Sequence, residues 1–181
     1  MDKNLLKHNH AVPSPESLEA DFRQLCRQAG SEGVVLLKND GAALPLSPGT
    51  VVSVFGRIQT NYIKSGTGSG GLVNVKYVVG IPDGLRRAGL TVNQELADLY
   101  AAWEQDHPFD NGTGWASEPW SQEEMPLDDA VVRTASVKSD AAVVVIGRSA
   151  GEDKDNQATE GSYLLSAAEE DMLLKVTTHF Q

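Results

Sequence analysis

Two short, almost uniformly apolar segments constrain the fold of this chain more than any other feature. One reads VVSVF at 51–55, where Ser53 is the single polar residue, and the other reads AAVVVIG at 141–147. A strand with one solvated face alternates apolar and polar residues, and neither segment does so. Both are therefore predicted to be strands covered on both faces, as in a parallel sheet between layers of helices.

Helical patterns alternate with these strands, which predicts an α/β fold: a three-layer α/β/α sandwich around a mostly parallel sheet. Ser166 and Glu169 have the spacing of a capping box at the start of the last helix, and Ser14 with Pro15 suits the start of the first. Further short strands are expected at 34–38 and 90–92. The predicted helices cover 14–30, 81–89, 93–106, 128–140 and 166–180. A covered parallel sheet normally has more strands than the two that the sequence predicts clearly, so we expect this sheet to be incomplete.

Composition and charge exclude several classes of partner. The chain has 181 residues, 40% hydrophobic and 22% charged, which is typical of an ordinary globular domain. Its net charge of -10 argues against nucleic acid and anionic membranes, which attract clustered Lys and Arg. It contains no apolar run of about 20 residues that could span a bilayer. The first residues lack the apolar core of a secretory signal, so a cytoplasmic location is expected.

Cysteine and histidine usage predicts neither a disulfide nor a metal site. Cys26 is the only cysteine, which excludes an internal disulfide and a cysteine-based metal cage. Its place in a helical pattern predicts that it faces a core rather than acting as a nucleophile. The four histidines lack metal-ligand spacing outside the terminal HNH at 8–10, where solvated side chains are expected. We therefore expect no metal and no cofactor.

Two loops leave the predicted strands at their carboxyl ends, where open parallel sheets bind ligands. The first loop contains GTGSGG, in which Gly66, Gly68 and Gly71 match the dinucleotide pattern G-x-G-x-x-G. That pattern works in a tight turn from strand to helix, but here the strand ends about ten residues too early. The nucleotide interpretation is therefore weak. The alternatives are a flexible surface loop, or a backbone that closely approaches a ligand or another domain.

A long connection at 106–127 carries Trp115 and Trp120 together with Phe109. Connections of this length in compact domains are usually functional or disordered, and large aromatic residues are unusual in a disordered segment. The tryptophans could anchor the loop to the core, or their rings could stack on the apolar faces of sugars. The sequence favours anchoring without excluding sugar binding.

The second loop, which begins GRSAGEDKDN at 147–156, places Glu152, Asp153 and Asp155 at the mouth of a strand. Neighbouring negative charge and partial burial would both raise the pKa of a carboxyl group, as a general acid requires. Alternatively, the loop is solvated and its carboxylates pair with Arg148 and Lys154. The charge pattern alone favours the solvated loop.

Several motifs taken together resemble glycoside hydrolase family 3, the β-glucosidase-like enzymes. They are EGVVLLKNDGAALPL, KSGTGSGGLVN, EMPL, AVVVIGRSAGEDKDN and GSYLLSAAEEDMLLKV, in this order. The resemblance runs from Glu32 to the end. It implies a tail and leading helix at 1–31 and a partial α/β sandwich domain at 32–181. Because no barrel precedes the motifs, the chain most resembles the circularly permuted branch, in which the sandwich comes before the barrel.

The resemblance also implies a retaining, exo-acting mechanism on β-linked glycosides or oligosaccharides. An Asp on a barrel absent from this chain would be the nucleophile, and Glu152 would be the general acid and base. Asp153 stands where many members have Gly, and Asn156 where many have Arg. Residues expected to line the sugar cleft are Gly66, Gly68, Ser69, Trp115, Trp120, Arg148 and Asp155.

The expected partners are a carbohydrate substrate and the absent barrel domain, with no nucleic acid and no membrane. The isolated chain is expected to be inactive, and an exposed sheet edge would make it prone to form oligomers. Two other functions stay open: a carbohydrate-binding or assembly module without catalysis, and a nucleotide-binding α/β domain.

Overall fold

The computed structural model describes residues 15–63, 65–72, 75 and 77–180. The chain divides into two compact units, Met1–Pro45 and Leu46–Gln181, which are described separately below.

The first unit contains helix α1, Pro15–Gly33, and a 3-10 turn, Asp40–Ala42. The predicted helix is confirmed, although it continues beyond Gly30; its proposed cap Ser14 lies outside the described residues. Cys26 is exposed, so the prediction that it faces a core is wrong. The predicted strand at 34–38 is also wrong, because these residues form no strand and their apolar side chains are exposed. The described part of this unit has no second layer that could bury them.

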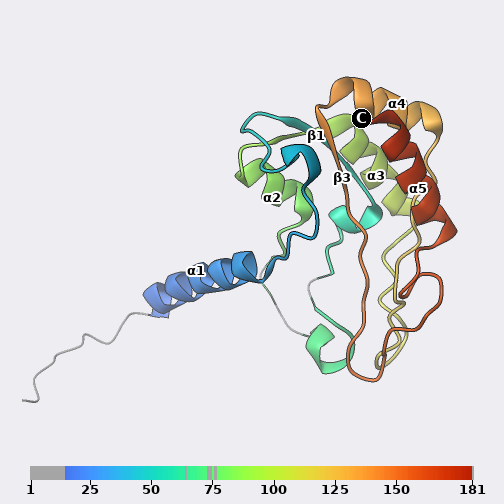
Figure 1. The fold of residues 1–181 in the computed structure, drawn as a ribbon. Helices are drawn as coiled ribbons and strands as arrows, with labels where there is room; N and C mark the ends of the chain where they lie inside the picture. The colour runs from blue at the N-terminus through green and yellow to red at the C-terminus, as the bar shows by residue number, and fades with distance from the viewer. Residues whose placement is uncertain (1–14, 64, 73–74, 76, 181) are drawn as a thin grey trace, which may run out of the picture. The chain divides into compact units, whose positions relative to one another are not determined.

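The second unit is built on a parallel sheet whose strand order is β2-β1-β3. The predicted strands at 51–55 and 141–147 are confirmed, although the second is shorter than expected, and the segment at 90–92 contains the short third strand. Figure 1 shows the helices that flank this sheet. The elements are β1 (Val51–Phe55), α2 (Ile81–Arg87), β2 (Thr91–Val92), α3 (Gln94–Asp106), α4 (Asp129–Lys138), β3 (Ala141–Val144) and α5 (Ala167–His179).

Alternate side chains of β1 point into two separate cores, which confirms the three-layer α/β/α architecture. Val52 and Val54 are fully buried on the face that packs against α2. Phe55 is buried on the opposite face, among residues of α3, α4 and α5. Its ring meets Phe180 edge to face, with the ring centroids 5.8 Å apart. Burial on both faces explains why the strand sequence lacks polar alternation.

The polar exception in β1 is satisfied inside the fold. Ser53 is completely buried, and its Oγ lies 2.8 Å from the Oγ of Ser139. It also accepts a hydrogen bond of 2.9 Å from the side chain of Asn93. Asn93 in turn caps α3. Because buried hydroxyl groups need hydrogen-bond partners, this small network makes a serine acceptable in a covered strand.

Local signals define the helix ends next to the loops. Ser166 and Glu169 form the predicted capping box at the start of α5, which is confirmed. The turn after α2 contains Gly89 with φ +87°, a conformation that favours glycine. Within the part of the chain that the structure describes, no helix is both long and apolar enough to cross a membrane.

Candidate active site

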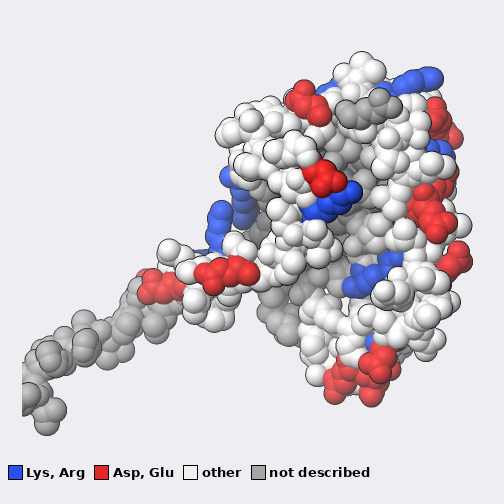
Figure 2. Space-filling view, viewed as in Figure 1, with Lys and Arg blue, Asp and Glu red and all other residues white. Residues whose placement is uncertain are grey.

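Three loops of the second unit run side by side away from the carboxyl edge of the sheet, below it in Figure 1. We call them the glycine loop (56–71, after β1), the tryptophan loop (107–127, between α3 and α4) and the acidic loop (147–165, between β3 and α5). Thr67 and Gly151 form a parallel bridge between the first and third loops. The two loops that were predicted to leave the strands at their carboxyl ends therefore meet. Figure 2 shows acidic side chains gathered where the loops turn.

Glu152 lies at the contact between the acidic loop and the glycine loop. Its Oε2 accepts two hydrogen bonds from Ser69, one of 3.0 Å from the main-chain N–H and one of 2.7 Å from the hydroxyl. Its main-chain oxygen accepts a third, of 3.1 Å, from the hydroxyl of Thr67. The glycine loop therefore positions both the backbone and the carboxylate of Glu152.

The hydrogen bonds from Ser69 hold the pKa of Glu152 below its usual value, because they stabilise the ionised form. The prediction of a raised pKa for Glu152 is therefore wrong. The Glu152 side chain is exposed, so little desolvation opposes ionisation.

Gly66 and Gly68 of GTGSGG are required by close contact between the glycine loop and the acidic loop. Gly68 has φ +71°, and a Cβ at this position would lie only 2.7 Å from the Cβ of Glu152. At Gly66, an added Cβ would lie 2.5 Å from the main-chain oxygen of Ala150. The loop then continues as a short 3-10 helix, Gly68–Leu72, instead of the α-helix that a dinucleotide site needs. These contacts favour the close-approach interpretation over the nucleotide interpretation.

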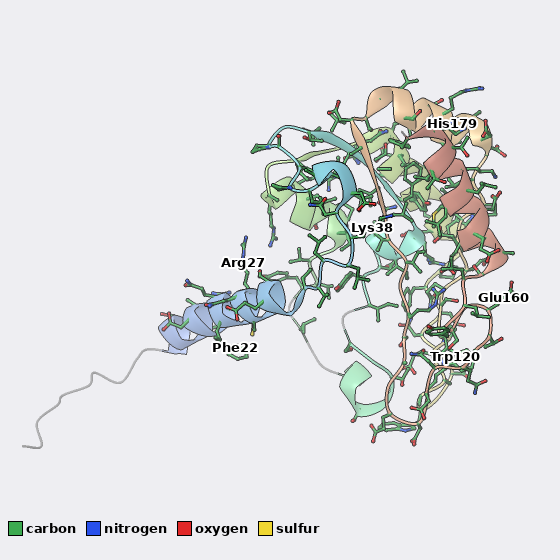
Figure 3. All side chains as sticks on the ribbon, viewed as in Figure 1. Phe22, Arg27, Lys38, Trp120, Glu160 and His179 are labelled. Carbon is green, nitrogen blue, oxygen red and sulfur yellow. The ribbon has the colours of Figure 1, made fainter. Side chains whose placement is uncertain are left out.

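Both tryptophans of the tryptophan loop contact the acidic loop. Trp115 donates a 3.0 Å hydrogen bond to the Asp153 carboxylate, and Trp120 donates one of 3.2 Å to the main-chain oxygen of Asp155. Figure 3 places Trp120 among the loops, away from the sheet. Trp120 is half-buried, whereas 56% of Trp115 is exposed. Anchoring therefore describes both residues, and Trp115 also presents apolar surface to solvent.

Asp153 adopts a conformation that is uncommon for residues other than glycine. Its φ is +60°, in the left-handed region, where Asp is tolerated better than most residues. This geometry explains how Asp can occupy a position where Gly would be easiest. It also turns the Asp153 carboxylate toward Trp115.

Arg148 and Lys154 do not pair with the acidic residues beside Glu152. Arg148 forms a two-pronged ion pair with Glu169 of α5, at 2.6 and 2.7 Å. Lys154 donates to the main-chain oxygen of Glu118, and its Nζ lies 5.4 Å from the centre of the Trp120 ring. The alternative in which these two cations neutralise the acidic loop is therefore wrong.

A buried hydrogen-bond network supports the loops where they leave the sheet, and it was not predicted from the sequence. Gly56, at the exit of β1, donates a 2.8 Å hydrogen bond to the hydroxyl of Tyr100. Glu124 accepts hydrogen bonds from the main-chain N–H groups of Arg57 and Met125. Burial raises the pKa of Glu124, although these bonds oppose the increase. The EMPL motif, which contains Glu124 and Met125, was the only available signal, and it did not specify this role.

A cavity of about 430 Å³ opens between the glycine loop and the tryptophan loop. Apart from the carboxylate of Glu118, its lining is mostly neutral, with polar and aromatic groups that include Asn61, Tyr62, Ser65, Phe109, Gln122 and Ser149. Such a lining suits an uncharged, hydroxyl-rich ligand better than an anion. Among the residues that the structure describes, no group of three or more His, Cys, Asp or Glu could hold a metal ion.

Comparison with known proteins identifies the family. Residues 34–181 match the glycosyl hydrolase family 3 C-terminal domain, and the chain belongs to this family. It is 49% identical over 160 residues to a β-glucosidase of Ruminococcus albus, covering 88% of this chain and 17% of that protein. It is 33% identical over 135 residues to β-glucosidase A of Butyrivibrio fibrisolvens, covering 74% of this chain and 16% of that protein.

Solved structures agree with this assignment. The chain is similar to a β-glucosidase from Paenibacillus barengoltzii, with a TM-score of 0.84 and 55% identity, covering 88% of this chain and 17% of that one. It is also similar to β-glucosidase 3B from Thermotoga neapolitana in complex with glucose, with a TM-score of 0.77 and 30% identity, covering 90% and 22%. The chain thus spans about a fifth or less of the length of these relatives.

Proposed function

We propose that this chain is the sandwich domain of a retaining β-glucosidase and that Glu152 is its general acid and base. The observation that carries the proposal is the placement of Glu152, an exposed carboxylate fixed at the carboxyl edge of the sheet by two bonds from Ser69. The relatives named above are β-glucosidases, and one of them was solved with glucose. A β-glucoside is therefore the proposed substrate class.

The nucleophile is proposed to be an Asp on a barrel domain outside this chain. In the first step, the protonated carboxyl group of Glu152 gives its proton to the glycosidic oxygen while the bond to the anomeric carbon breaks. The Asp carboxylate forms an ester with that carbon. In the second step, the Glu152 carboxylate takes a proton from a water molecule, whose oxygen displaces the Asp and yields the free sugar.

The contacts of Glu152 suggest which of its oxygens carries the proton. Ser69 donates both of its hydrogen bonds to Oε2, so Oε2 is the oxygen that is stabilised as an acceptor. We assign the transferred proton to Oε1. The pKa of Glu152 is below its usual value while the side chain is exposed, so the carboxylate is ionised. The substrate and the barrel must therefore exclude water from the Glu152 carboxyl group, which raises its pKa, before this group can act as an acid near neutral pH.

The test compares Glu152→Gln with wild type in the protein made from the complete reading frame. We expect the variant to lose on the order of 10²- to 10⁴-fold in activity on phenyl β-glucoside, a poor leaving group. The loss should be far smaller on 2,4-dinitrophenyl β-glucoside, whose leaving group needs little protonation. Glu160→Gln, in the same loop and also exposed, is the matched control and should resemble wild type. Equal slowing of both substrates by Glu152→Gln would reject the proposal.

A second assay tests whether the chain acts alone. Aryl β-glucosides are offered to the 181-residue chain and to the complete protein side by side. Activity in the complete protein alone is expected. Activity in the short chain would show that the nucleophile lies within these residues, whereas inactivity of both would favour a carbohydrate-binding module that uses the exposed Trp115.

A further inference from the structure

Arg148 uses all of its side-chain N–H groups within the protein. Its Nε donates to the main-chain oxygen of Ser162 at 2.6 Å. Its two terminal nitrogens donate to the main-chain oxygens of Gly147 at 2.9 Å and Leu164 at 3.3 Å. Each of these nitrogens also donates to one carboxylate oxygen of Glu169. Because a guanidinium group has five N–H donors, none remains for a sugar hydroxyl.

The partners of Arg148 lie at both ends of the acidic loop. Gly147 is at its start, Ser162 and Leu164 are near its end, and Glu169 is in the first turn of the following helix. One side chain thus joins the exit of β3 to the start of α5 and closes the base of the loop that carries Glu152. A loop whose ends are fixed in this way keeps fewer conformations accessible.

Glu169 is a rigid partner for this contact. It is only 5% exposed, and its carboxylate also accepts the main-chain N–H of Ser166 in the capping box at 2.8 Å. Burial alone would raise the pKa of Glu169, but the bonds from Arg148 and Ser166 outweigh it and keep the pKa below its usual value. The carboxylate is therefore ionised at neutral pH, and its position is set by the helix as well as by Arg148.

We propose that Arg148 is a positioning residue that holds Glu152 in place for proton transfer by closing the base of the acidic loop against Glu169. This inference rests on the proposed function of Glu152. It replaces the expectation that Arg148 contacts the sugar. Proton transfer requires the acid to lie within hydrogen-bond reach of the leaving oxygen. Freeing the two ends of the acidic loop should therefore slow the step that depends on the acid more than the other steps.

The experiment measures leaving-group dependence in the protein made from the complete reading frame. Arg148→Ala should lose on the order of 10- to 100-fold in kcat on phenyl β-glucoside, the range expected when a catalytic group is displaced by about 1 Å. On 2,4-dinitrophenyl β-glucoside the loss should be at most about threefold, since that step depends little on the acid. Arg148→Lys keeps the charge but not the two-pronged geometry, so it should fall between Ala and wild type.

Two control variants separate the possible outcomes. Arg86→Ala removes an arginine that pairs with Asp83 on α2, outside the three loops, and should leave both activities unchanged. Glu152→Gln should show the larger selective loss described above. If it does and Arg148→Ala does not, the inference is wrong while the proposed function stands. If Glu152→Gln shows no selectivity, the proposed function fails, and this inference fails with it.

A second readout follows the loop itself. Gly151 and Lys154 exchange main-chain hydrogen bonds at the tip of the acidic loop. Their amide hydrogens should exchange faster with deuterium in Arg148→Ala than in wild type, whereas amides of β1 should be unchanged. Unchanged exchange at the tip, or equal slowing of both substrates, would overturn the inference. Should Arg148→Ala fail to fold, the same two measurements on Arg148→Lys decide the question.

Discussion

Replacing Gly68 by alanine tests the contact between the glycine loop and Glu152. The alanine Cβ would lie 2.7 Å from the Cβ of Glu152 and 2.8 Å from its Oε2. Since carbon atoms pack best at about 3.5–4.0 Å, one of the two loops must move by about 1 Å. Gly70, two residues away, provides the matched control, because a Cβ there would have nothing within 4 Å.

Two effects should lower the stability of Gly68→Ala. Gly68 has φ +71°, and placing alanine in this left-handed region costs about 1–2 kcal/mol. Relief of the steric overlap adds to this cost, so we expect the free energy of unfolding to fall by about 2 kcal/mol or more. Because an outward shift of the loop would also separate Ser69 from Glu152, the carboxylate should lose the bonds that keep it ionised.

The decisive assay is an NMR titration of the Glu152 carboxyl group in the 181-residue chain. In wild type its pKa lies below the usual value of 4.5 because of Ser69. In Gly68→Ala it should rise toward that value, while Gly70→Ala should leave it unchanged. A group with a depressed native pKa stabilises the fold above its unfolded pKa, and this contribution is lost as the pH falls through the native value. The stability difference between Gly68→Ala and wild type should therefore shrink as the pH falls from 4.5 through the lower wild-type pKa of Glu152.

The result that would refute this reasoning is specific. If Gly68→Ala and Gly70→Ala gave the same Glu152 pKa and the same unfolding free energy, the close approach of the two loops would have no energetic consequence. A lower stability with an unchanged pKa would mean that Ser69 moves together with Glu152. In that case the cost would arise from the backbone of residue 68 alone.

Three further predictions concern the frame beneath the loops, each measured by chemical denaturation. Gly56→Ala should destabilise the chain by about 3 kcal/mol, because the new Cβ would lie 2.1 Å from the main-chain oxygen of Val145. The control Gly84→Ala, on the open surface of α2, should stabilise the chain by about 0.5–1 kcal/mol. Equal effects of the two substitutions would contradict the steric argument. Tyr100→Phe should cost about 1–3 kcal/mol, since it leaves the buried N–H of Gly56 without its acceptor, and a neutral result would imply that another group replaces the hydroxyl. Ser166→Ala should cost about 1 kcal/mol through loss of the capping box, and no change in stability would show that this cap is unimportant.

The core of the second unit could be predicted because its signals are local and strong. The apolar runs at 51–55 and 141–147 favour strands between layers of helices, although β3 is only partly buried, and the Ser166–Glu169 spacing specifies a helix start by its own hydrogen bonds. Parallel pairing then places the loops after both strands at the same edge of the sheet. That topological step predicted the meeting of the glycine loop and the acidic loop without any side-chain information.

The errors in the first unit have a different origin. Apolar residues at 34–37 and helical spacing around Cys26 show which side chains could be buried, but they do not say against what. A strand also needs a neighbour for its main-chain groups, and the described residues of Met1–Pro45 provide none. Hydrophobic pattern is therefore sufficient only where the same unit supplies the complementary layer.

The details of the candidate site could not be predicted, because they depend on side chains far apart in the sequence. Ser69 and Glu152 are separated by 83 residues, and their hydrogen bonds reverse the direction of the pKa shift expected from the neighbouring carboxylates. Arg148 lies next to an acidic run, and the sequence suggested that it either pairs with those carboxylates or lines the sugar cleft. Its actual partner, Glu169, was recognised only as a helix cap.

The arrangement around Glu152 bears on when the proposed general acid would carry a proton. In this chain the carboxylate is exposed, held by Ser69 and ionised at neutral pH, so it has no proton to give. Covering it with a sugar and a second domain removes water, which raises the pKa of a carboxyl group, whereas the two bonds to Oε2 persist and limit the increase. The acid would thus become protonated only in the assembled, occupied site. It follows that the strength of the Ser69 contact should set the basic limb of the pH–rate profile, where the acid loses its proton, and that weakening this contact should move that limb to higher pH.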